Sequence, residues 1–231
     1  MLACALAACG FRARPGADST ADAGPPFCDP DDPHLIACYE LEGDTHDGSS
    51  HHLDATMTHV TFPDGKIGRA MQCGADSAVD VPDSALLDVA TLTVEAWIHP
   101  SQLPVLGARA GILDVDRQFG LFLHPGGLVT CGVASILAMP TTVTAIPLDR
   151  WTHVACTYDG ESAVLYLDGA AVGSQRGTTI ATNGATGISI AADNPPGSGS
   201  HLIGLIDQVR LLDVARTAAE ICADAGMASC P

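Results

Sequence analysis

The stretch Trp151-Thr-His-Val-Ala-Cys-Thr-Tyr-Asp-Gly160, followed by Ser162-Ala-Val-Leu-Tyr-Leu-Asp-Gly-Ala-Ala171, decides the fold. Residues alternate with a period of two in both segments, which is the pattern of β-strands. The strands end at Asp159-Gly160 and at Asp168-Gly169, and such dipeptides supply the positive φ angles of a tight primed turn. Strands of about eight residues joined by these turns leave no room for crossover helices, so the sequence predicts an antiparallel sheet.

This double hairpin resembles the central part of the laminin G-like, concanavalin A-like jelly-roll domains of bacterial secreted proteins. Other segments are similar to the same family and occur in its order: residues 35–43, 65–71, 92–100, 204–212 and 215–221. The resemblance implies an all-β fold, a concanavalin A-like jelly-roll β-sandwich of two antiparallel sheets with one short C-terminal helix. We expect the helix near residues 216–224, where Thr217 and Glu220 have the spacing of a capping box.

Length and composition fit one domain with a core of small apolar side chains. The 231 residues are 47% hydrophobic but only 4% aromatic. We expect residues 1–9 to be a lipoprotein-type signal, residues 10–33 a disordered tether rich in proline, glycine and aspartate, and residues 34–231 the jelly-roll domain. The formal net charge of −17 would repel a nucleic-acid backbone, so nucleic acid is not expected as a partner.

The N-terminal sequence Leu6-Ala7-Ala8-Cys9 fits a bacterial lipobox, in which cleavage leaves Cys9 as the lipidated residue. No basic residue precedes it, so either the true start lies further upstream or the segment is only a tail of small residues. No apolar run reaches the length of a membrane span, and we expect membrane contact only through this lipid. The predicted location is outside the cytoplasm of a Gram-negative bacterium, as an outer-membrane lipoprotein or at the cell surface or in the periplasm.

Nine cysteines without a Cys-x-x-Cys pair indicate disulfides in an oxidising compartment rather than a zinc site. Setting aside Cys4 and Cys9 leaves an odd number, so one thiol is expected to stay free. Cys131 and Cys156 lie in predicted strands of one meander, and we expect them to pair across one ladder. The remaining alternatives stay open: a bridge among Cys28, Cys222 and Cys230 at the ends of the domain, and a bridge or buried thiols at Cys38 and Cys73.

Catalytic patterns are missing from the sequence. Jelly-roll glucanases carry Glu-x-Asp-x-Glu on one strand, where alternate carboxylates enter one cleft. The nearest matches here are Glu40-Leu-Glu42 and Asp114-Val-Asp116, which we interpret as solvated acids at a strand edge and in a loop-like stretch. There is no Gly-x-Ser-x-Gly nucleophile motif. His153 is interpreted as a packed or hydrogen-bonded residue of the sheet, and we therefore expect no enzyme activity.

The sequence offers two candidate metal sites. The histidines 46, 51, 52 and 59 lie in a polar loop without the spacing of a zinc site, so ligation by them is the weaker interpretation. In related domains the loop after the first strand meets a Gly-x-Ile-Asp strand, whose aspartate here is Asp207. Calcium prefers six to eight oxygen ligands, and carboxylates from Asp47 and Asp207 would contribute to a structural Ca²⁺ site. The alternative is that Asp207 binds loop backbone without an ion.

The sequence therefore predicts a non-catalytic, exported binding or adhesion module. It would recognise a carbohydrate or a protein partner at the cell surface. A diverged glycoside hydrolase or polysaccharide lyase of the same fold is the alternative. Sugar sites need an exposed aromatic ring beside polar groups, and both tryptophans, Trp97 and Trp151, lie in predicted strands where packing in the core is the more common fate.

Overall fold

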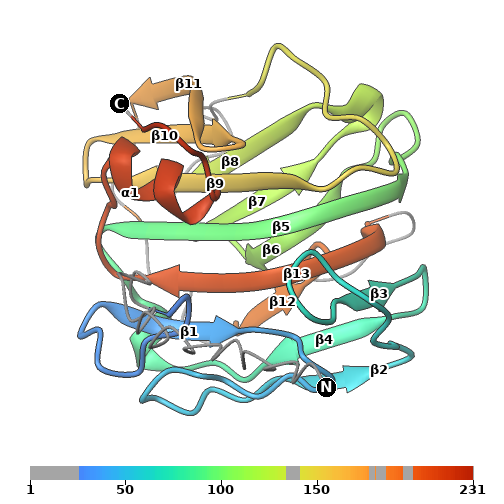
Figure 1. Ribbon diagram of the computed structural model, residues 1–231, viewed down its shortest axis with the longest axis horizontal. Helices are drawn as coiled ribbons and strands as arrows, with labels where there is room; N and C mark the ends of the chain where they lie inside the picture. Colours follow the sequence, from blue (N-terminus) through green and yellow to red (C-terminus); the bar gives the residue numbers. More distant parts are fainter. Residues whose placement is uncertain (1–25, 134–140, 177–179, 181–185, 195–199, 231) are drawn as a thin grey trace, which may run out of the picture.

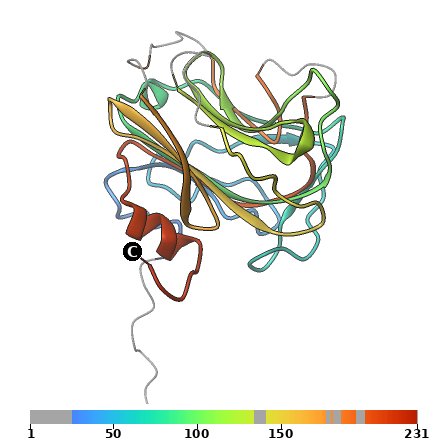
Figure 2. The same ribbon diagram turned by 90° about the horizontal axis from the view of Figure 1, so that it is seen from above.

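Two antiparallel β-sheets pack face to face, and one short helix lies on the outside of one of them (Figure 1, Figure 2). The computed structural model describes residues 26–133, 141–176, 180, 186–194 and 200–230. The predicted all-β jelly-roll sandwich is confirmed. No helix among these residues is long and apolar enough to span a membrane.

The seven-stranded sheet has the order β1-β13-β5-β9-β10-β11, and β3 also pairs with β13. Its strands are β1 (Leu35–Tyr39), β3 (Met71–Cys73), β5 (Leu92–Gln102), β9 (Thr152–Tyr158), β10 (Ser162–Leu167), β11 (Ala170–Arg176) and β13 (Ile203–Leu212). The six-stranded sheet has the order β2-β4-β12-β6-β7-β8. Its strands are β2 (Thr56–Thr58), β4 (Ala78–Val81), β6 (Ala110–Val115), β7 (Phe119–Leu123), β8 (Val129–Val133) and β12 (Ile188–Ile190). Short 3₁₀ turns lie at Ala85–Leu87 and Pro125–Gly127, and helix α1 (Ala218–Asp224) follows β13.

The double hairpin forms β9, β10 and β11, as predicted, but its two turns differ. Asp168 and Gly169 both have positive φ angles, 46° and 76°, which suits a primed turn. At the other turn only Gly160 has a positive φ, and the Asp159 carboxylate accepts hydrogen bonds from the N–H groups of Glu161 and Ser162 instead. The turn at Asp159-Gly160 is therefore closed by a side chain as well as by the backbone.

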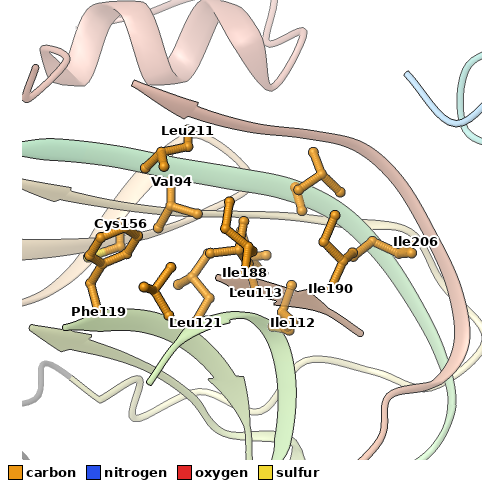
Figure 3. Close-up of a cluster of buried hydrophobic side chains, with 14 of the residues drawn as sticks. Val94, Ile112, Leu113, Phe119, Leu121, Cys156, Ile188, Ile190, Ile206 and Leu211 are labelled. Atoms are coloured by element: carbon orange, nitrogen blue, oxygen red, sulfur yellow. The ribbon is translucent and has the colours of Figure 1, made fainter. Parts of the chain in front are cut away.

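The core lies between the two sheets and consists mainly of branched aliphatic side chains (Figure 3). Val94 and Leu211 enter it from the seven-stranded sheet, and Ile112 and Leu121 enter it from the six-stranded sheet. All four are at most 1% exposed. Because alternate residues of a strand point to opposite faces, the intervening residues are directed away from this core.

Helix α1 begins at the predicted capping box. The Thr217 hydroxyl accepts a hydrogen bond from the Glu220 N–H, and the Glu220 carboxylate accepts one from the Thr217 N–H. Ile221 of the helix packs against Ala155 and Tyr166, on the face of the seven-stranded sheet that points away from the core. The helix thus buries one end of that outer face.

Cys131 and Cys156 form a disulfide, with Cα atoms 5.9 Å apart, but they do not pair across one ladder. Cys131 belongs to β8 of the six-stranded sheet, whereas Cys156 belongs to β9 of the seven-stranded sheet. Both side chains point into the core, where the bond joins the two layers. The prediction of a shared ladder was wrong because strands that are close in a meander can enter different sheets.

The other cysteines resolve the alternatives that the sequence left open. Cys28 pairs with Cys38, and Cys222 pairs with Cys230. Cys73 is a buried free thiol on β3, so one thiol stays unpaired in the described part of the chain. Burial raises the pKa of the Cys73 thiol to about 12, which keeps it protonated and unreactive at neutral pH.

The N-terminal segment contacts the domain earlier than expected. Phe27 and Cys28 pack in a small cluster with Leu35 and Leu212, and the carbonyl of Phe27 accepts a hydrogen bond from the Arg210 guanidinium. The predicted tether over residues 10–33 is therefore wrong for its last residues, because the Cys28–Cys38 disulfide fastens them to β1. Cys9 and the rest of residues 1–25 lie outside the described residues.

The Cys131–Cys156 disulfide between the sheets gives a stability prediction. The disulfide closes a loop of 25 residues. Replacing both cysteines by alanine should lower the free energy of unfolding by about 3 kcal/mol, because the unfolded chain gains conformational entropy. Alanine replacement of Cys222 and Cys230, which close a loop of 8, is the matched control and should cost about 1 kcal/mol less. Urea unfolding measures both variants, and equal losses would contradict the expected dependence on loop length.

Candidate functional site

The outer face of the seven-stranded sheet carries aromatic and polar side chains. Along β5, Ala96 and Ile98 belong to the core, so Trp97 and His99 point outward. On β13, Ile206 belongs to the core and its neighbour Leu205 points outward. Helix α1 covers one end of this face, and β3 lies toward the other end (Figure 1).

Four side chains form a row across the end of this face that α1 does not cover. Leu205 pairs with His99 on one side and with Gln72 on the other, and the ring centroids of His99 and Trp151 are 5.3 Å apart. All four residues are partly exposed. Neighbouring strands are about 4.8 Å apart, so this aromatic row (Trp151, His99, Leu205 and Gln72) extends over roughly 15 Å.

Trp97 and Lys66 lie beside the aromatic row. Trp97 is 6% exposed, and the ammonium of Lys66 lies 4.1 Å from the centroid of its ring, which is a cation–π contact. The backbone N–H groups of Lys66 and Ile67 both donate hydrogen bonds to the Asp207 carboxylate on β13. Asp207 therefore fixes the loop that carries the lysine.

A buried ionic cluster occupies the part of the face next to α1. Nε of Arg210 is 2.6 Å from the Glu95 carboxylate, and Nη2 of the same guanidinium is 2.6 Å from the Asp224 carboxylate of the helix. Nε2 of His153 is 3.1 Å from the second oxygen of Glu95. The side chains of Glu95 and His153 are fully buried, so neither can reach a substrate.

Burial disfavours the charge of Glu95, but its partners outweigh burial. The contact with His153 and the positive charge of Arg210 lower the pKa of Glu95 to about 2. Glu95 is therefore ionised at neutral pH, and the cluster joins β5, β9, β13 and α1. His153 lies within the sheet, where the sequence placed it, and has a structural role here.

A second buried acid, Asp114, lies on the outer face of the six-stranded sheet. It belongs to β6 and is 3% exposed, so the interpretation of Asp114 as a solvated loop acid was wrong. Its carboxyl group is hydrogen-bonded to Asp193 and accepts the N–H of Asn194 at 2.7 Å. Arg109 binds Asp193 through two nitrogens, at 3.0 and 2.7 Å, and lies 3.8 Å from the ring centroid of Phe122.

The carboxyl groups of Asp114 and Asp193 interact directly. Burial, together with the hydrogen bond that the protonated acid donates to the Asp193 carboxylate, raises the pKa of Asp114 to about 8, so this group holds a proton at neutral pH.

This proton predicts a pH dependence of stability. An unfolded aspartate loses its proton near pH 4, whereas folded Asp114 keeps its proton until about pH 8. The stability that Asp114 contributes is therefore fully present below pH 4 and is lost as the pH rises toward 8, with a slope of at most about 1.4 kcal/mol per pH unit.

The variant Asp114→Asn tests this dependence, because an amide mimics the neutral acid and does not titrate. We expect Asp114→Asn to become more stable relative to the wild type between pH 5 and 8, as measured by urea unfolding at each pH. Asp116→Asn, two residues further along the chain and beyond β6, is the control. Parallel pH profiles of the wild type and Asp114→Asn would show that Asp114 is already ionised in the folded protein.

The predicted calcium ligands are both engaged by protein donors. The carboxylate of Asp47 accepts hydrogen bonds from the N–H groups of Cys38, Ser49 and Leu53 and from the Ser49 hydroxyl. These donors direct hydrogens at both oxygens, an environment that suits an anion and not a cation ligand. Asp207 accepts two N–H groups of the 66–67 loop, and burial raises its pKa to about 6.

The residues around Asp47 therefore do not fit a calcium ion. Among the described residues, no three metal-ligating side chains gather in one place. The structure instead resembles the alternative in which the acids bind loop backbone, although Asp207 binds the 66–67 loop and not the loop that holds Asp47.

Chelation tests the calcium prediction directly. We expect the melting temperature to be the same in EDTA and in excess Ca²⁺, because four protein donors already satisfy Asp47. A higher melting temperature in Ca²⁺ that Asp47→Asn abolishes would restore the calcium site.

The remaining candidates lie apart from the aromatic row. His46 contacts Asp54 at 2.8 Å and stacks near His52, and His59 contacts the backbone carbonyl of Asp76 at 3.2 Å. Glu42 accepts the N–H of Arg69. Among the residues that the structure describes, these contacts do not form a group of three side chains that could hold a metal ion.

The comparisons with known proteins identify the family. The family model described as the concanavalin A-like lectin/glucanases superfamily matches residues 73–222. The chain belongs to this superfamily. The match runs from the last residue of β3 into α1 and includes Trp97, His99, Trp151 and Leu205 of the outer face. A search of curated proteins found no match.

Several solved structures share the two-sheet architecture of this chain. Domain 4 of AbnA, a GH43 extracellular arabinanase from Geobacillus stearothermophilus solved with arabinotriose, is 22% identical, with a TM-score of 0.69 over 83% of this chain and 98% of that domain. The binding domain of Paraclostridial Mosquitocidal Protein 1 is 16% identical, with a TM-score of 0.68 over 83% of this chain and 52% of that one. Trypanosoma rangeli sialidase is 13% identical, with a TM-score of 0.62 over 83% of this chain and 32% of that one. These similarities show the fold, and this chain spans only a third of the sialidase.

Sequence reasoning missed His99, Lys66 and Gln72 as members of the outer face. The alternation of β5 carried the signal for His99, because it follows the apolar Ile98 and is two residues from Trp97. Lys66 and Gln72 come from short segments whose pairing with β13 depends on the tertiary fold. Trp151 was identified, but was expected in the core.

Proposed function

We propose that this protein is a non-catalytic carbohydrate-binding module and that the aromatic row is its binding surface. The observation that supports this proposal is the partly exposed ring of Trp151, immediately before β9, beside His99 on β5. A sugar stacks its C–H face on such a ring while neighbouring polar groups bind its hydroxyls. His99 and Gln72 are the polar members of the row.

The relatives support the ligand class. The domain of AbnA was solved in complex with arabinotriose, and the sialidase also acts on a sugar according to its name. Their identities to this chain are low, so the particular sugar does not transfer to it. A carbohydrate ligand also agrees with the cell-surface location that we propose, with Cys9 as the site of a lipid anchor. The three disulfides indicate an exported protein.

We propose no catalytic role for the acids of this site. Glu95 is fully buried in an ionic cluster, and Asp207 is fixed by loop N–H groups. A diverged glycoside hydrolase or polysaccharide lyase is the alternative function, and a protein partner is the alternative ligand.

Trp151→Ala tests the proposed surface. We expect the soluble domain to bind glycans on an array, with arabinotriose as the first ligand for titration calorimetry. Loss of the ring should weaken binding of the glycan found by at least about tenfold. Phe27→Ala removes another partly buried ring, which contacts Arg210 near the ionic cluster, and should leave the affinity unchanged.

Three outcomes would contradict parts of the proposal. Equal affinity of Trp151→Ala and the wild type would place the site elsewhere. The absence of binding across the array would favour a protein partner. Release of shorter sugars, detected by mass spectrometry of the incubated glycan, would show that the protein is an enzyme.

A further inference from the structure

The charges around the aromatic row differ from those of the rest of the molecule. The chain has a net charge of −17, and Lys66 is its only lysine. Lys66 is exposed and lies over Trp97, next to the row. Arg150 is exposed as well and immediately precedes Trp151. The hydrogen bond from Asp149 N–H to the carbonyl of Pro100 places this segment at the end of β5 that carries His99.

These two cations have no carboxylate or carbonyl partner within the described part of the chain. Every other described arginine is engaged. Their partners are carboxylates, or in one case a backbone carbonyl: Arg69 with the Phe62 carbonyl, Arg109 with Asp193, Arg117 with Asp116, Arg176 with Glu161, Arg210 with Glu95 and Asp224, and Arg216 with Asp224. In a protein with a large excess of acids, two unpaired cations beside one aromatic surface are available to a ligand.

Two acids close to this surface are occupied by backbone donors. Asp207 accepts the N–H groups of Lys66 and Ile67, and Asp168 accepts the N–H of His153. Neither forms an ion pair with Lys66 or Arg150. Asp64 and Asp149, which are close in sequence to Lys66 and Arg150, are also exposed, so the surface carries charges of both signs, and its two cations lack an ion-pair partner among the described residues.

We propose that the aromatic row binds an acidic glycan, one whose sugar rings carry carboxylates. This inference rests on the proposed carbohydrate-binding function and names the class of sugar. Trp151 would stack on a ring, and Lys66 and Arg150 would bind carboxylates on either side. Arginine binds a carboxylate through two parallel hydrogen bonds, whereas lysine acts as a mobile point charge, so the pair tolerates ligands of different lengths.

The experiment compares an oligogalacturonide with its methyl ester, because the two differ mainly in charge. Calorimetric titration should show tighter binding of the acid form, and this preference should decrease when NaCl is raised, since exposed charges are screened by salt. Lys66→Met and Arg150→Met should each weaken binding of the acid form by about three- to fivefold and leave the ester unchanged. Arg117→Met removes the same charge in the β6–β7 turn and should have no effect.

The outcomes separate this inference from the proposed function. Equal binding of the acid and the ester, abolished in both cases by Trp151→Ala, would overturn the acidic ligand and keep the carbohydrate-binding surface. If all three charge variants weaken binding of the acid form equally, the effect of charge is general, and the specific roles of Lys66 and Arg150 are overturned. Preference for a sulfated glycan over the oligogalacturonide would overturn the carboxylate. The failure of every glycan to bind would overturn both proposals.

Discussion

The contact between two sheets through aliphatic side chains is the constraint on which the rest of this structure depends. With 4% aromatic residues the chain has few large rings to separate the layers. Face-to-face sheets are usually about 10 Å apart, yet the Cα atoms of Cys131 and Cys156 are 5.9 Å apart where β8 faces β9. The layers therefore converge at this point, and a disulfide can take the place of packed side chains.

The core then determines what the outer faces carry. Because β5, β9 and β13 each place every other residue in the core, their remaining side chains share one outer face. Helix α1 covers one end of this face, where Arg210 binds both Glu95 and Asp224. Buried ion pairs gain little net stability, since desolvation offsets attraction. The ion pairs instead determine where the helix lies. They hold α1 at one end of the outer face, and the aromatic row at the other end stays accessible.

The sequence was sufficient for the fold because the relevant signals are local. The period of two from Thr152 to Leu167, the Asp-Gly turns and the Thr217–Glu220 capping box each depend on neighbours in the chain, and all three occur as predicted or nearly so. The errors concern contacts between distant segments. Cys131 and Cys156 were paired correctly but placed in one sheet, and Asp114 was assigned to a loop although Asp193 and Asn194 bury it.

The same reasoning explains why the ligand surface could not be read from the sequence. Gln72, His99, Leu205 and Trp151 come from separate segments of the chain and meet only because β3, β13, β5 and β9 are successive neighbours in the sheet. A surface built on strands holds its side chains in place before the ligand arrives, which reduces the entropy lost on binding. Its charge is also local. At physiological salt, interactions are screened beyond about 8 Å, so the charges that act on a ligand seated on the row are those of Lys66, Arg150 and the neighbouring Asp149 more than those of distant acids.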